Sequence, residues 1–329
     1  MPFPTRLTSI AALAAVSLAA TTVSACGDDS TPAAPAGPTV VVTTPVLGAI
    51  VRDVVGSAAT VTVLMPNGTD PHDWSPSAKD VRALRSATLV VDNGLQLEER
   101  AVKAIGKATA NGVKSFTAAA HIEVRRLVEG ETGQTGTATS DGHGHDDDHG
   151  DDHGGDAAGG TADPHLWLDA SRMAKVARAL GPALAAVGID TADRAETTAK
   201  ALDALDAEVA ATIGKIPSER RKLVTGHESM GYFGERYGLR LVGAVVPSLG
   251  SQAETSAKQL AALKATIAAE KVPAIFTELG TPAATVAALA RETGVRVVEL
   301  GTHTMPPDGR YSTFLSGIAT AIVAGLGAP

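Results

Sequence analysis

Two segments of the same pattern carry the clearest chemical signal in the chain. Residues 70–74 (DPHDW) and 163–167 (DPHLW) both follow D-P-H-x-W, and they contain both tryptophans of the sequence. Proline fixes its own φ and disfavours helix in the residue before it, so each histidine is expected in a stiff loop. A stiff loop loses little entropy on metal binding, and a nearby indole can limit the access of water. The repeat favours His72 and His165 as metal ligands over loop histidines capped by core tryptophans.

A third histidine lies where open α/β sheets bind their ligands. His227 follows the apolar run KLVTG (222–226), so it is expected at the carboxyl end of a strand. Alone it would be a weak candidate. Together with His72 and His165 it is the natural third ligand.

The C-terminal half offers several candidates for a fourth group. Asp308, in the loop GTHTMPPDGRY (301–311), could complete a His3Asp tetrahedron or cap the helix that follows. His303 is the rival ligand in the same loop. Glu278, at the end of the predicted strand PAIFTE, is expected beside the ligands as a hydrogen-bond acceptor or as part of the cleft floor.

A histidine- and aspartate-rich tract lies just before the second D-P-H-x-W segment. Residues 141–156 read DGHGHDDDHGDDHGGD, with metal-binding side chains and no hydrophobic residue. Such a segment cannot bury a core, and ordering it around one tight tetrahedron would cost much entropy. We therefore predict an accessory metal-collecting loop, within residues 129–162, rather than the main site. Its ligands would be His143, His145, His149 and His153.

The N-terminus predicts export and a lipid anchor. Arg6 precedes the apolar run IAALAAVSLAA, which is too short to span a bilayer, and the run leads to Cys26, the only cysteine. A lone thiol in an oxidising compartment has no disulfide partner. We expect residues 1–25 to be a lipoprotein signal peptide, Cys26 to be lipidated, and residues 26–38 to be a flexible tether. The alternative is an ordinary secretory peptide with an incidental cysteine.

Charge gives no argument for a nucleic-acid partner. The formal net charge is −8, but residues 129–163 hold ten acidic side chains and no lysine or arginine. The remaining chain is therefore close to neutral.

The pattern of apolar runs predicts an α/β protein with two lobes, each a mainly parallel sheet flanked by helices. Short β-branched runs alternate with helical stretches over 39–189 and again over 217–329. Residues 190–216 form an unbroken helical pattern that would join the lobes as one long linking helix.

Four segments together resemble the metal-specific solute-binding proteins of ABC transporters. They are NGTDPHDWSPS, DPHLWLD, VTGHESMGYF and DGRYSTFL, in that order, and the likeness extends from Thr39 to Leu326. The resemblance implies one transition metal between the lobes, held by His72, His165, His227 and Asp308. Histidine at the third position implies zinc, whereas glutamate there goes with manganese. A His/Asp-rich loop ahead of the second ligand is also typical of the zinc branch.

The resemblance implies a lipid-anchored receptor that captures Zn²⁺ outside the cytoplasm and delivers it to an ABC permease. A monomer is expected, and whether a metallochaperone loads the site is left open. A zinc hydrolase is the alternative of another class, but the chain has no H-E-x-x-H pair, and four protein ligands leave no open position for catalysis. A metal buffer or surface adhesin on the same fold is not separated from transport by the sequence.

Overall fold

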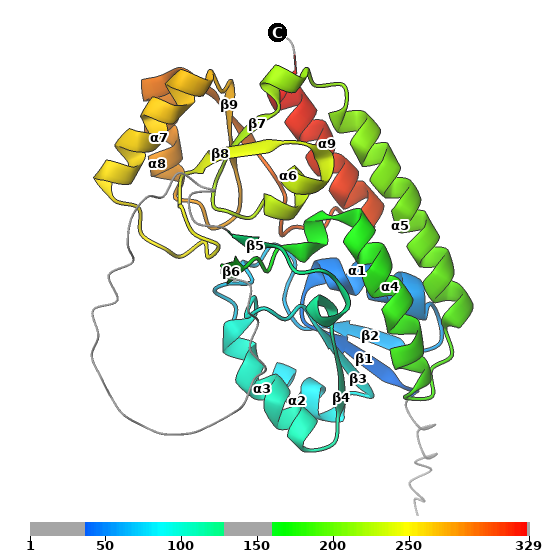
Figure 1. Ribbon diagram of the computed structural model, residues 1–329. Helices are drawn as coiled ribbons and strands as arrows, with labels where there is room; N and C mark the ends of the chain where they lie inside the picture. The colour runs from blue at the N-terminus through cyan, green and yellow to red at the C-terminus, as the bar shows by residue number, and fades with distance from the viewer. Residues whose placement is uncertain (1–36, 128–159, 328–329) are drawn as a thin grey trace, which may run out of the picture. The chain divides into compact units, whose positions relative to one another are not determined.

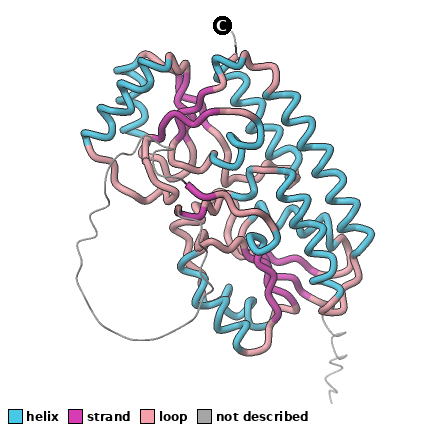
Figure 2. Tube along the Cα trace, in the orientation of Figure 1, coloured by secondary structure: helices cyan, strands magenta, loops and turns pink. Residues whose placement is uncertain are grey.

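Runs of β-branched residues form two parallel sheets in the computed structural model, which describes residues 37–127 and 160–327 (Figures 1 and 2). The first sheet has the strand order β2-β1-β3-β4, and the second has the order β10-β9-β7-β8. Parallel neighbours need crossover connections, which the intervening helices supply. The strands are β1 (Thr39–Val42), β2 (Thr60–Val63), β3 (Leu89–Asp92), β4 (Lys114–Thr117), β7 (Lys222–Thr225), β8 (Arg240–Ala244), β9 (Ala274–Thr277) and β10 (Arg296–Glu299).

The helices begin at recognisable signals. Ser77 and Ser256 each cap a helix by a capping box, and Asp169 caps another by accepting from two backbone N–H groups. The helices are α1 (Pro45–Val55), α2 (Ala78–Ser86), α3 (Glu99–Ala110), α4 (Ala170–Ala185), α5 (Ala192–Ile213), α6 (Gly231–Tyr237), α7 (Ala257–Glu270), α8 (Ala283–Thr293) and α9 (Tyr311–Leu326).

Both faces of each sheet are covered, as the apolar strands require. In β1, Val41 packs into a core with α2 and α3, while Val40 and Val42 face the core that includes α1, α4 and α5. In the second sheet, Val224 packs with α7 and α8, and Leu223 packs with α6 and α9. Alternate residues of a strand point to opposite faces, so each strand serves two cores. One of these cores is continuous across both sheets.

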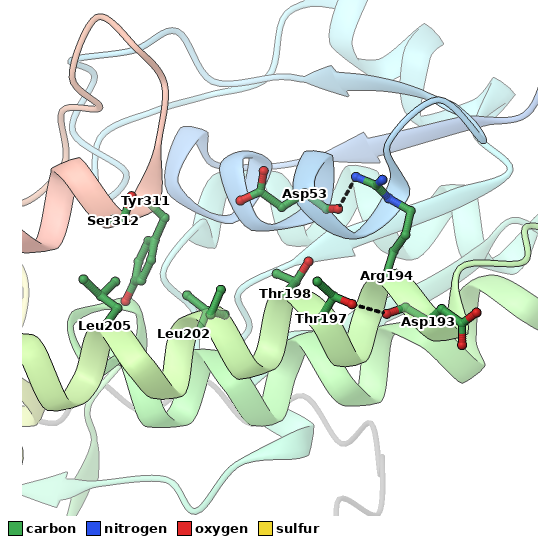
Figure 3. Close-up of a pocket in the computed structure, with 10 residues that line it drawn as sticks. Asp53, Asp193, Arg194, Thr197, Thr198, Leu202, Leu205, Tyr311 and Ser312 are labelled. Atoms are coloured by element: carbon green, nitrogen blue, oxygen red, sulfur yellow. Dashed lines mark hydrogen bonds between the residues drawn. The ribbon is translucent and has the colours of Figure 1, made fainter.

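Helix α5 contacts elements from both halves of the described chain. It packs against α1 and α4 on the side of the first sheet, and against α6 and α9 on the side of the second (Figure 1). Near its start, Arg194 donates to the backbone oxygens of Asp53 (2.8 Å) and Val54 (3.3 Å) at the end of α1. Farther along, Asp206 pairs with Arg236 of α6, with 2.8 Å between Oδ1 and Nε. Arg194 also lines a pocket of about 440 Å³ that α5 forms with α1 and the start of α9, whose lining residues are drawn in Figure 3.

The predicted fold class is confirmed, with one strand of the first sheet and one of its covering helices added. The sequence pattern did not single out β4, an edge strand of polar composition, or α3. The remaining strands of the two sheets lie within the predicted apolar runs, which extend one or two residues beyond them. The described residues from Gly37 onward belong to one compact unit, so the predicted lobes are two halves of that unit, and their boundaries at 189 and 217 stay a prediction.

A short hairpin-like pair stands apart from both sheets. Strands β5 (Arg126–Leu127) and β6 (Thr161–Ala162) pair antiparallel, with Leu127 opposite Thr161. They bracket residues 128–159, so His143, His145, His149 and His153 lie outside the described residues, as do Cys26 and the signal segment. Within the described ranges, every helix is too short or too polar to cross a membrane.

Candidate metal centre

Four histidines converge on one point. His72, His165, His227 and His303 each offer one ring nitrogen, and these nitrogens all lie within 4.8 Å of one another. The Nε2 atom of His165 lies 3.2 Å from that of His72 and 3.1 Å from that of His227. Three of the four side chains are buried, and His72 is half-buried. The four come from loops far apart in the chain.

The spacing fits a tetrahedral ion. With metal–nitrogen bonds of 2.0–2.1 Å, the edge of a tetrahedron is about 3.3–3.4 Å, close to the two Nε2 separations. The Nε2 atom of His303 is buried and has no hydrogen-bond partner among the described residues. A buried polar atom without a partner is costly, so this nitrogen is well placed to bind a cation. The arrangement can hold one divalent cation through imidazole nitrogens alone.

The opposite ring nitrogen of three histidines is held by the protein. His165 Nδ1 lies 2.8 Å from Asp163 Oδ1, and His303 Nδ1 lies 3.0 Å from the hydroxyl of Thr302. His227 Nδ1 lies 3.0 Å from Glu278 Oε1, a charge contact without hydrogen-bond geometry. For His165 and His303, an N–H donated from Nδ1 fixes the tautomer and leaves the Nε2 lone pair for a metal.

Glu278 connects two of these histidines. Its carboxylate accepts hydrogen bonds from the hydroxyls of Ser229 (2.8 Å) and Thr302 (2.6 Å) and from the backbone N–H of His227 (3.2 Å). Gly226 permits this approach, because a Cβ there would lie 2.1 Å from the hydroxyl of Thr281. Glu278 therefore lies behind two of the clustered histidines as a hydrogen-bond acceptor, and its role toward a bound metal stays a prediction.

The two D-P-H-x-W loops share a local structure. In each, the aspartate Oδ1 accepts the backbone N–H of the histidine two residues later, at 3.0 Å for both Asp70 and Asp163. Trp167 is buried against His165 and His303, with its Nε1 donating to the backbone oxygen of Thr302 (2.9 Å). Trp74 instead packs in the core that contains α2 and α3. Only the second tryptophan therefore borders the cluster in the expected way.

Burial and charge keep most of the cluster neutral. Burial lowers the pKa of His72 to about 4 and that of His303 to about 3, and it holds the pKa of His165 well below its usual value. Burial would also lower the pKa of His227, but the negative charge of Glu278 beside it outweighs burial, and that pKa is raised. His227 is thus the cluster's main site for a proton when no metal is bound.

Asp308 does not join the histidines, so the expectation that it is the fourth ligand is corrected. Its side chain is exposed and accepts from the backbone N–H of Arg310 (3.0 Å) and the hydroxyl of Thr313 (2.7 Å), at the start of α9. These bonds lower its pKa. His303 takes the place given to Asp308, because it follows the carboxyl end of β10 as His227 follows that of β7.

The residues behind the ligands were largely missed from the sequence. Asp163 had a signal in its repeated motif, since Asp70 holds the same position. Thr302 and Ser229 had none, because they meet Glu278 only after two loops fold together. Arg125 was also missed. Its guanidinium forms an ion pair with Asp163 (3.3 Å), the residue that contacts the ring of His165.

Two parallel sheets with a buried histidine cluster between their loops define a metal-binding receptor of the two-lobe type. The family described as "Zinc-uptake complex component A periplasmic" matches residues 40–325. The chain therefore belongs to this family of substrate-binding components of ABC metal uptake systems, which are receptors and not enzymes. The expectation of a non-catalytic receptor is confirmed.

Similar proteins support the same class. The chain is 30% identical to the high-affinity zinc uptake system protein ZnuA of Paracoccus denitrificans, over 92% of this chain and 96% of that one. It is 29% identical to the zinc-binding protein TroA of Treponema pallidum, over 82% and 80%. The solved structure of TroA covers 89% of this chain and all of its own, with a TM-score of 0.71 and 27% identity. A manganese-binding lipoprotein, MntA of Halalkalibacterium halodurans, is 25% identical over 77% and 74%.

Proposed function

We propose that this chain is an extracytoplasmic zinc receptor that binds one Zn²⁺ through His72, His165, His227 and His303 and delivers it to an ABC permease. The observation that carries the proposal is the convergence of four imidazole nitrogens within 4.8 Å, one of them buried without a partner. Four protein ligands form a closed site, which suits capture and release rather than catalysis.

The ligand set favours zinc over manganese. Imidazole suits zinc, whereas manganese prefers carboxylate and other oxygen ligands. The carboxylates nearest the cluster are engaged behind it, Asp163 with His165 and Glu278 with His227. Relatives with zinc and with manganese in their names both occur, so the donor set of this chain is the more specific argument.

Equilibrium metal titration of paired variants tests the proposal. We expect the full chain to bind one Zn²⁺ tightly at the cluster and Mn²⁺ far more weakly. His303→Ala should lower zinc affinity about 100-fold or more, since even residues behind a ligand typically contribute 10–100-fold.

Asp308→Ala is the matched control, because both residues lie in one loop. It should change zinc affinity less than about twofold, given that its carboxylate only caps α9. Loss of the tight site in Asp308→Ala, with retention in His303→Ala, would restore the His3Asp assignment and refute ours. Tighter binding of Mn²⁺ than of Zn²⁺ would refute the choice of metal.

The remaining parts of the proposal concern residues outside the described ranges. We retain Cys26 as the lipidated residue and His143, His145, His149 and His153 as an accessory loop that collects zinc near His165. β6 supports the latter, because it ends one residue before Asp163, the partner of His165. Monomeric state and any metallochaperone partner stay predictions.

A further inference from the structure

His72 differs from the other three histidines. It is half-buried where they are buried. Each of the others has its Nδ1 atom held by a named partner, but His72 Nδ1 has no hydrogen bond among the described residues. The position of His72 therefore depends on the loop that carries it.

That loop is held from the opposite half by Ser251. Asp70 Oδ1 accepts the backbone N–H of His72 (3.0 Å), and its Oδ2 accepts the hydroxyl of Ser251 (2.5 Å). One carboxylate thus joins the backbone of His72 to the loop after β8. Gly280, with φ +86°, lies beneath this contact, where a Cβ would be 2.6 Å from Asp70 Oδ2.

Asn67 holds the same loop at a second point. Its amide donates to the backbone oxygen of Met305 (2.9 Å) and accepts from the backbone N–H of Met305 (2.7 Å). Met305 lies two residues after His303. The loop of His72 is therefore tied directly to the loop of His303.

The second D-P-H-x-W motif is held differently. Asp163 directs one oxygen to His165 and the other to Arg125, and all three residues belong to the first half. The aspartate of the second motif thus pairs within its own half, and that loop reaches the other half through Trp167, which donates to Thr302. In the first motif it is the aspartate itself that contacts the other half. The backbone of His72 therefore depends on a cross-half contact more directly than the ring of His165 does.

We propose that Ser251 and Asn67 are positioning residues that hold the His72 loop against the opposite half and so set the residence time of the bound ion. This rests on the proposed four-histidine zinc site. While both contacts are intact, His72 stays on the metal. When they break, His72 leaves first, and the ion remains on three ligands with an open side.

The test is the rate of zinc release from the loaded full chain into an excess of a chelating dye. Ser251→Ala removes a hydrogen bond to a carboxylate, and we expect release to be about tenfold faster. Asn67→Ala is an independent variant and should act in the same direction. Ser248→Ala is the matched control: it lies in the same loop, its hydroxyl accepts only a local bond from Gly250, and release should match the parent chain.

Cobalt absorption distinguishes positioning from ligand loss. The Co²⁺-loaded variants should keep the spectrum of the parent chain, because all four histidines still bind. Release rates within twofold of the parent in both Ser251→Ala and Asn67→Ala overturn the proposal. An altered cobalt spectrum also overturns it, because the ligand set itself would then have changed. If the parent chain binds no zinc at one-to-one stoichiometry, it is the proposed function that has failed.

Discussion

The four imidazoles of the cluster differ in pKa. Three have lowered pKa values because burial disfavours their charged form, while Glu278 raises the pKa of His227. The four interact and so titrate as a unit. Because only His227 has a raised pKa, we expect the unit to take up its first proton on His227 as the pH falls. Free histidines with a pKa near 6.5 would hold several protons at mildly acidic pH.

Zinc binding should therefore displace about one proton near pH 6, and not three or four. A histidine must be neutral to bind zinc, so affinity falls as the pH falls below the raised pKa of His227. His72 stays neutral down to about pH 4, and His303 stays neutral down to about pH 3, because these are their lowered pKa values. The expected slope is about one decade of affinity per pH unit between pH 6 and pH 5. Calorimetric titration in buffers of different ionisation enthalpy counts the protons.

Release of three protons at pH 6 would contradict this account of the cluster. Glu278→Gln provides the comparison, since it removes the charge that raises the pKa of His227. In that variant the proton count should fall toward zero.

At the scale of elements, the pair β5–β6 decides where the histidine-rich segment enters the fold. Leu127 lies opposite Thr161, so the ends of the segment are held side by side. Arg125 and Asp163 flank the pair and contact each other at 3.3 Å. Asp163 also contacts the ring of His165. The residues that flank the histidine-rich segment therefore include the partner of one proposed ligand.

Replacing residues 128–160 by Asn-Gly should leave the main site intact. The two paired strands are already in register for a two-residue turn, and Asn-Gly is the preferred sequence for it. We expect one tight zinc site in equilibrium titration, with affinity within about threefold of the parent. Zinc capture at low free zinc should be slower, as stopped-flow measurement would reveal. Disappearance of tight binding would mean that the removed segment supplies the main site.

At the scale of the whole molecule, the two halves are linked by more than the chain connection. A single core is continuous across both sheets, and α5 is bonded to α1 through Arg194 and to α6 through Asp206. A packed connector of this kind limits how far the halves can move apart. We therefore expect zinc release to involve small shifts of loops, such as the loop of His72, rather than a large separation of the two halves.

The membrane attachment also belongs to this scale. Cys26→Ala should shift the protein from the membrane fraction to the soluble extracytoplasmic fraction, because it removes the residue that would carry the acyl anchor. Zinc affinity of the purified variant should equal that of the parent, since residues 37–329 form a unit of their own. Fractionation followed by mass measurement of the N-terminal peptide would check this. An unmodified Cys26 in the parent chain would reject the anchor.

The sequence by itself determined the fold class, the family and three of the four clustered histidines. Period and composition are local properties, so the strands and the stiff loops of His72 and His165 could be predicted from neighbouring residues. The choice between His303 and Asp308 could not, because it depends on which side of one loop faces the cluster. Nor could the contacts of Glu278 with Thr302 or of Asp70 with Ser251, which join residues far apart in the chain. Only the tertiary structure brings those groups within hydrogen-bonding distance, and that proximity decides which side chains join the cluster and which loops contact the loop of His72.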